Sequence, residues 1–170
     1  MQPYFAETSR PDEPRFEFLF EISLEWGGLQ NISNMPSGHG RGATYIEKGI
    51  VRGPHLNGVI CPRSGADWAQ FRPDTVLGLD ARYMLEADDG TLILMHNKGY
   101  LAPRGDDVLS RIQAWMFRDG PEVPFEEYYL RVTPTFEVET GRYDWLMRTI
   151  VVGIGSRQKV GNTIRYYALL

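Results

Sequence analysis

Four charged or hydroxyl side chains alternate with apolar residues in two separate stretches of the chain. Asp80 and Arg82 share one face of an extended chain, and so do Tyr129 and Arg131 further along. A carboxylate can act as a base, while guanidinium and phenol groups can donate hydrogen bonds to an oxygen that gains charge during a reaction. We predict these four residues as a catalytic set inside a pocket, where paired Asp and Arg would compensate each other's charge.

The alternative is that both polar faces point to solvent, because Asp and Arg are rarely buried unpaired. A barrel that holds a ligand would favour the inward orientation, since its interior needs a few polar groups to orient the bound molecule. A shift of each strand by one residue would exchange its two faces, and Tyr83 and Tyr128 would then point inward instead.

Two further stretches place an aspartate beside a tryptophan, Gly65-Ala-Asp-Trp68 and Tyr143-Asp-Trp-Leu146. A flat apolar ring beside a hydrogen-bonding group suits a pocket mouth, although both tryptophans could equally fill the core. His96 is a weaker candidate for proton transfer, with a structural or surface role as its alternative. We therefore expect a second set of residues to bind substrate: Asp67, Trp68, His96, Tyr143 and Trp145.

Motifs for cofactors and metals are absent. Gly153-Ile-Gly155 lacks the third glycine of a dinucleotide-binding fingerprint, and no phosphate-binding Gly-Lys-Ser/Thr occurs. The three histidines have no metal-ligand spacing: His39, His55 and His96. We expect a site that uses neither a cofactor nor a metal.

The composition is that of a folded globular chain, with 170 residues, 42% hydrophobic and 24% charged. A net charge of −4 argues against nucleic acid as a partner, and no apolar run is long enough to span a membrane as a helix. The single cysteine, Cys61, and an N-terminus without a signal-peptide pattern favour the cytoplasm. The expected partner is a hydrophobic or aromatic small molecule, and a homodimer is left open.

Period-two alternation is clearest from Phe16 to Trp26, which predicts a long antiparallel strand. Gly27-Gly28 is predicted to end it, and residues 31–42 to form a loop. Asp88-Asp89-Gly90 predicts a tight hairpin. Residues 107–117 are the one helix expected, with a strand as the alternative.

Shorter strands are expected at 43–46, 49–51, 58–61, 76–86, 91–97, 128–133, 148–154 and 162–169. This pattern favours an all-β fold, a closed antiparallel up-and-down barrel with an internal pocket. We expect residues 1–14 to be a flexible arm and residues 15–170 to form a single domain.

The same stretches resemble domain-of-unknown-function family 3237 in order and spacing from Phe16 to Tyr167. The motifs are Gly53-Pro-His-Leu-Asn-Gly58, Gly65-Ala-Asp-Trp68, Arg72-Pro-Asp74, Leu79-Asp-Ala-Arg-Tyr83, Asn97-Lys-Gly99, Tyr129-Leu-Arg131 and Tyr143-Asp-Trp-Leu146. The resemblance implies a lipocalin-like barrel with an internal pocket and a role in small-molecule metabolism. The family positions it matches are Asp67, Trp68, Asp80, Arg82, Tyr129, Arg131, Tyr143 and Trp145.

Met147 stands where the family usually has Asn, which implies a more apolar pocket or a different substrate, and we include it among the substrate-binding positions. Residues 101–127 are long and aromatic enough to form a lid, a point left open.

Two functions fit these observations. One is a cofactor-free enzyme that isomerises, cyclises or performs a cycloaddition on an aromatic, polyketide-like or terpenoid-like molecule. The other is a binding or carrier barrel without catalysis. The sequence does not separate them, because orienting a ligand and catalysing its reaction use the same residue types.

Overall fold

The computed structural model describes residues 13–170. All but the last two residues of the predicted N-terminal arm, residues 1–14, lie outside the described residues. Seven long strands form most of the fold: β1 (Phe16–Ile32), β2 (Gly40–Arg52), β6 (Leu77–Ala87), β7 (Leu92–Pro103), β8 (Tyr128–Val138), β9 (Val151–Gln158) and β10 (Gly161–Leu169). Three short strands complete it: β3 (Gly58–Ile60), β4 (Ala66–Asp67) and β5 (Gln70–Phe71).

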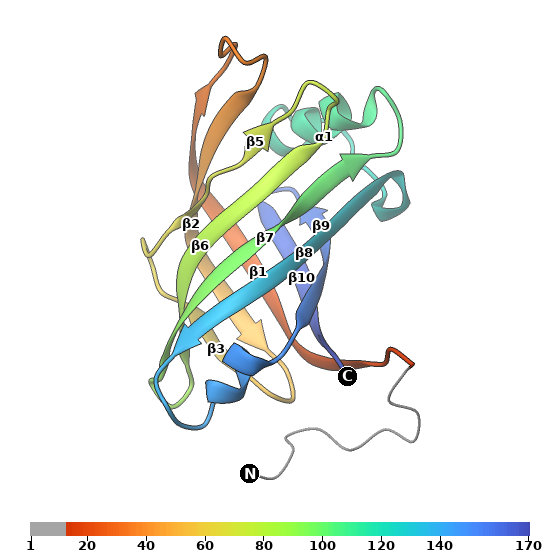
Figure 1. Cartoon of the computed structure of the whole chain (residues 1–170). Coiled ribbons are helices and arrows are strands. Elements are labelled where there is room, and N and C mark those ends of the chain that lie inside the picture. Colours follow the sequence, from red (N-terminus) through yellow and green to blue (C-terminus); the bar gives the residue numbers. More distant parts are fainter. Residues whose placement is uncertain (1–12) are drawn as a thin grey trace.

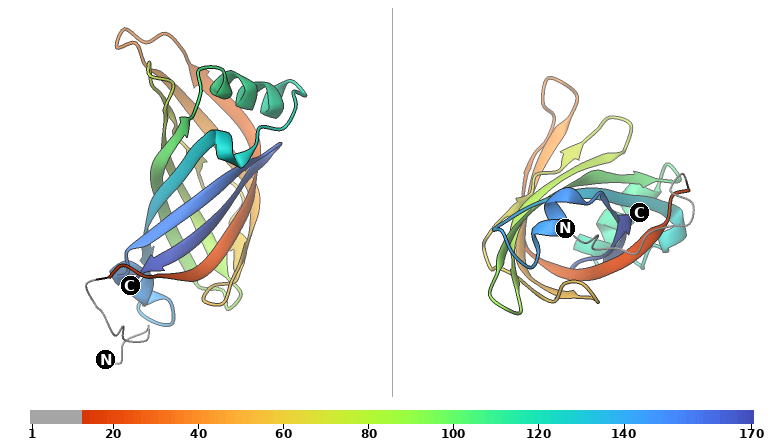
Figure 2. Two further views of the ribbon diagram at one scale, coloured as in Figure 1. Left: turned by 90° about the vertical axis from the view of Figure 1, so that its right-hand side faces the viewer. Right: turned by 60° about the horizontal axis from the view of Figure 1, so that its bottom comes forward.

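The strands close into an antiparallel barrel (Figures 1 and 2). Their order is β1-β10-β9-β8-β7-β6, then the three short strands, which together act as one interrupted strand between β6 and β2. Pairing of β2 with β1 closes the ring. The predicted closed all-β barrel with one short α-helix is therefore confirmed, and the Asp88-Asp89-Gly90 hairpin joins β6 to β7, with Gly90 at a φ of 85°.

The first hairpin is longer than predicted. Gly27-Gly28 does not end β1, which runs on to Ile32 and pairs with β2 from Gly40. The register shifts between Trp26 and Gly28, and a Cβ at Gly27 would lie 2.4 Å from the Glu47 carboxylate. The two glycines therefore mark a bulge rather than a strand end.

Helical segments close both ends of the barrel. Helix α1 (Val108–Phe117), within the predicted range 107–117, follows β7 and lies over one end, followed by a 3-10 turn, η1 (Phe125–Glu127) (Figure 2). A second 3-10 turn, η2 (Asp144–Arg148), closes the other end and delays the start of β9 to Val151. No helix in residues 13–170 is long and apolar enough to cross a membrane.

Two groups of buried side chains fill the barrel. The larger group lies toward the η2 end and is rich in aromatic residues, among them Phe20, Tyr83, Phe136, Trp145 and Tyr166. The smaller group joins α1 to the opposite end through residues such as Leu101, Ile112 and Tyr128. The helix is thus packed onto the mouth of the barrel by its apolar face.

Candidate functional site

The predicted catalytic residues face outward, which corrects the expectation that they lie inside the barrel. On β6 the inward face carries Tyr83 while Arg82 is exposed, and on β8 Tyr128 is buried while Tyr129 is 43% exposed. Strands β6 and β8 therefore both have the alternative orientation, in which Tyr83 and Tyr128 point inward.

The reason is the free energy of burial. The inward positions of β6 also include Leu79, Ala81 and Leu85, so the opposite orientation would expose these apolar groups and bury charged ones. A tyrosine on the inward face places its ring in the core and needs a partner only for its hydroxyl.

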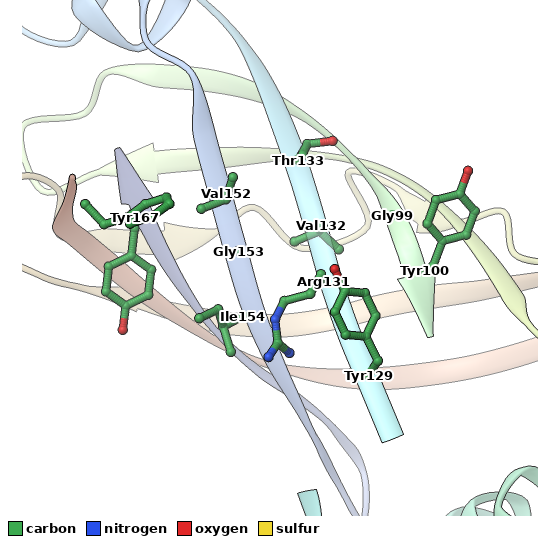
Figure 3. A pocket seen from close by; sticks show the side chains of 11 residues that line it. Gly99, Tyr100, Tyr129, Arg131, Val132, Thr133, Val152, Gly153, Ile154 and Tyr167 are labelled. Carbon is green, nitrogen blue, oxygen red and sulfur yellow. The ribbon is translucent and has the colours of Figure 1, made fainter. Parts of the chain in front are cut away.

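On the outer surface the four residues form two separate groups. Asp80 pairs with His96, with 2.6 Å between Oδ1 and Nε2, and this replaces the expected pair with Arg82. Tyr129 and Arg131 line a groove of about 640 Å³ across β7 to β10, on the outer face of the barrel (Figure 3). Because β7 separates β6 from β8, the structure does not bring the predicted set together.

The predicted substrate-binding residues are also divided. Trp68 is half exposed and packs edge-on against Tyr45 outside the barrel, with 6.5 Å between ring centroids. Tyr143 and Trp145 are buried together at the η2 end, as core residues, and Met147 beside them is 54% exposed. Of this group, Asp67 alone lines the interior cavity described next.

A cavity of about 230 Å³ opens beneath α1. Leu109, Ile112 and Met116 of the helix line one side, and Leu77 and Leu101 of the barrel line another. Its lining also includes Trp26, Asp67 and Arg157. Trp26 and Asp67 also line a second space of about 30 Å³ further inside the barrel, large enough for one water molecule.

Asp67 is held at this junction by its backbone neighbours. Strand β4 pairs with both β2 and β6, and the Asp67 Oδ1 accepts a hydrogen bond of 2.9 Å from the backbone N–H of Asp80. Burial raises the pKa of the Asp67 carboxyl, against the opposing effects of that hydrogen bond and of the Arg157 charge. The carboxyl is therefore a stronger base than an exposed aspartate.

Arg157 is a buried cation, only 7% exposed. Its Nη1 donates to Asn162 at 3.0 Å, its guanidinium lies 5.1 Å from the Trp26 ring centroid, and its backbone N–H donates to the Tyr128 hydroxyl. Its Nε–H has no hydrogen-bond partner. Burial lowers its pKa, and the nearby Asp67 opposes that effect.

Deeper in the barrel lies a cluster of neutral polar groups. Asn97 donates from Nδ2 to the Tyr166 hydroxyl at 3.0 Å, while the Asn97 Oδ1 has no partner. Burial raises the pKa of Tyr83 and of Tyr166, so both hydroxyls stay protonated at neutral pH. They can donate hydrogen bonds but do not act as bases.

The interior is a better candidate site than the outer groove. In the groove, Arg131 already donates to the Leu130 carbonyl and packs over the rings of Phe125 and Tyr129. In the interior, by contrast, no carboxylate of residues 13–170 comes within 4 Å of the buried Arg157, and a buried charge without a partner is costly unless a ligand supplies one.

Sequence reasoning missed Trp26 as a site residue, and with it Asn97 and Arg157. A signal was present: Arg157 continues the inward alternation of Gly153 and Gly155, and Asn97 that of Ile93 and Met95, so each is a polar residue on an apolar face. Within residues 13–170, no three His, Cys, Asp or Glu side chains lie close enough together to hold a metal ion.

The fold and this interior define the class: a closed antiparallel barrel with a helix over its mouth and a few buried polar groups in a mostly apolar cavity. The chain belongs to the family described as "Protein of unknown function (DUF3237)", whose profile matches residues 14–169. The family expected from the motifs is thereby confirmed.

Relatives agree with this assignment. A UPF0311 protein of Clostridium acetobutylicum is 32% identical over 124 residues, which cover 73% of this chain and 74% of the relative. A UPF0311 protein of Rhodopseudomonas palustris is 30% identical over 141 residues, which cover 83% of this chain and 87% of the relative.

Solved structures share the barrel. A protein of unknown function from Clostridium acetobutylicum superposes with a TM-score of 0.82 at 28% identity, over 95% of this chain and all of that one. A protein from Penicillium herquei has the same fold, with a TM-score of 0.67 at 21% identity, over 96% of this chain and all of that one.

Proposed function

We propose that this barrel is a cofactor-independent enzyme that isomerises or cyclises a compact, ring-containing molecule by proton transfer at a carbon next to a carbonyl. One observation carries the proposal: a partly buried carboxyl with a raised pKa, Asp67, lines the same cavity as a buried arginine without an ion-pair partner among residues 13–170, Arg157. A base and an oxyanion-stabilising donor at one cavity are what such a reaction needs.

The reaction begins when the Asp67 carboxylate takes a proton from the carbon next to the carbonyl. The electrons of the broken C–H bond form the enolate C=C bond, and the carbonyl oxygen takes the negative charge. Arg157 stabilises that oxygen through its guanidinium. Where the enolate is conjugated with a second C=C bond, return of the proton from Asp67 to the far carbon of that bond shifts the double bond and gives an isomer. Where the enolate carbon attacks a second carbonyl carbon of the same molecule, the π electrons of that C=O bond move to its oxygen, which takes the proton from Asp67, and a ring closes.

The cavity supports a small and mostly apolar substrate. Its volume of about 230 Å³ is below the roughly 300–1,000 Å³ common for ligand pockets, which limits the substrate to a compact molecule. Apolar walls restrict its motion and bring reacting atoms together, which by itself lowers a barrier. The Penicillium herquei protein of the same fold is described as an enzyme, which favours a catalytic role over a carrier role.

Deuterium exchange tests the proposal without knowledge of the natural substrate. The probe is 2-tetralone, a two-ring ketone, incubated with the protein in D₂O and followed by proton NMR. The wild-type protein should accelerate exchange at the carbons next to the carbonyl, and Asp67→Asn should lower this rate roughly 100-fold or more.

Asp80→Asn is the matched control, because Asp80 lies on the outer face and its backbone N–H, which Asp67 uses, is unchanged. Equal rates for wild type and Asp67→Asn would refute the role of Asp67. Saturable binding of the probe without accelerated exchange would favour the carrier function.

A further inference from the structure

We propose that the cavity beneath α1 binds its ligand as an oxyanion, a phenolate or enolate, whose charged oxygen is held by the guanidinium of Arg157. This rests on the proposed use of the interior as the functional site, and it adds the charge state of the ligand.

The charges around the cavity favour an anion. The buried Arg157 and the exposed Arg118, at the C-terminal end of α1, both line it, while Asp67 is the one carboxyl among its lining residues. This cationic surface occurs in a chain whose net charge is −4. Apolar walls reduce screening by water, so each charge acts more strongly here than on the surface.

Two contacts fix the arginine side chain, and neither supplies a negative charge. Asn162 accepts from Nη1, and the ring of Trp26 lies against the guanidinium plane. No carboxylate of residues 13–170 comes within 4 Å of Arg157, which leaves its charge without an ion-pair partner. A buried charge without a partner is costly, and an anionic ligand would supply the partner.

Two ionisable groups face Arg157 from other strands, Asp67 on β4 and Tyr128 on β8. Burial raises the pKa of both, which favours their neutral forms. A neutral Asp67 does not repel an anion and can donate a hydrogen bond to it. An oxyanion at Arg157 beside a protonated Asp67 is also the state that follows proton transfer in the proposed reaction, so a phenolate is a stable mimic of the enolate.

A pair of probes of similar shape tests the inference. 4-Nitrophenol can lose its proton to the buffer and become a phenolate, whereas 4-nitroanisole cannot. The wild-type protein should bind the phenolate roughly tenfold or more tightly than the anisole, as expected for one hydrogen bond to a charged group. Binding should also shift the titration of 4-nitrophenol, followed by its visible phenolate absorbance, to lower pH.

Arg157→Met should abolish the preference and the shift while leaving 4-nitroanisole binding unchanged. Arg165→Met is the matched control, because Arg165 also lies over aromatic rings but on the outer face. If Arg157→Met does not fold, the wild-type comparison of the two probes decides alone.

Equal affinity of wild type for both probes, saturable binding of neither, or a preference that persists in a folded Arg157→Met protein would overturn the inference. A phenolate preference without exchange of 2-tetralone would retain the anion site and remove the proposed enzyme function.

Discussion

Asp67 occupies a position where its charge is unfavourable for folding. Its pKa is raised mainly because burial removes water from the carboxylate. A group with a raised pKa in the folded state contributes stability fully below its unfolded pKa, and that contribution is lost as the pH rises through the folded value. At neutral pH the wild-type protein therefore keeps in its cavity a carboxyl group whose ionisation reduces the stability of the fold, as functional sites often do.

Asp67→Asn is accordingly expected to stabilise the fold at neutral pH, on the order of 1 kcal/mol or about 2–4 °C in Tm. The amide oxygen can still accept the backbone N–H of Asp80. The difference in Tm from wild type should vanish below the ordinary aspartate pKa, where both side chains are neutral. Thermal unfolding across pH measures this, and a variant less stable than wild type at pH 7 would contradict it.

At the scale of the elements, an ion pair links helix α1 to the residue that directly precedes strand β8. Arg111 of the helix donates to both carboxylate oxygens of Glu127, the last residue of η1. This hydrogen bonding lowers the pKa of Glu127, so the pair persists above the ordinary glutamate pKa and is lost as the pH falls through the lowered value.

Glu127→Gln should loosen the helix at neutral pH without unfolding the barrel. We expect faster amide hydrogen exchange in α1 and a few-fold faster release of 4-nitrophenol from the cavity beneath it. Glu21→Gln, which removes a weak ion pair with Arg165 on the outer wall, is the control. Unchanged exchange in α1 would show that packing alone holds the helix.

Strand β4 positions Asp67, and Gly65 lets that strand approach β6. A Cβ at Gly65 would lie 1.6 Å from the backbone oxygen of Arg82, so Gly65→Ala must displace the backbone two residues before Asp67. We expect a loss of about 1–3 kcal/mol in the free energy of unfolding, with loss of 2-tetralone exchange.

Gly78→Ala on β6, where β6 pairs with the neighbouring short strand β5, is the control, because a Cβ there meets side-chain atoms no closer than 3.6 Å. Urea unfolding should show this variant within about 0.5 kcal/mol of wild type. Similar stability of both glycine variants would contradict the role assigned to Gly65.

At the scale of the whole molecule, the barrel could be predicted from the sequence while the identity of its inner face could not. Alternation and the Asp-Gly turn are local signals, and each correctly predicted its element. Which face of β6 turns inward depends on closure of the ring, because the alternation alone defines two faces without saying which is enclosed. The prediction placed Arg82 inside, but in the closed ring the apolar set that includes Tyr83 is enclosed.

Prediction of the site residues likewise required knowledge of how the strands close into a ring. Asp67 was predicted because a short motif contains it, but Trp26 and Arg157 reach the same cavity from strands far apart in sequence. Their meeting follows from the ring order of the strands, which no local pattern encodes.

A crystal structure of the protein with bound 4-nitrophenol tests most directly whether the interior, rather than the outer surface, is the functional site. We predict that the phenolate oxygen lies within hydrogen-bond distance of the guanidinium of Arg157, in the cavity beneath α1. A probe found in the outer groove against Tyr129 and Ile154, with the interior cavity unchanged, would contradict it.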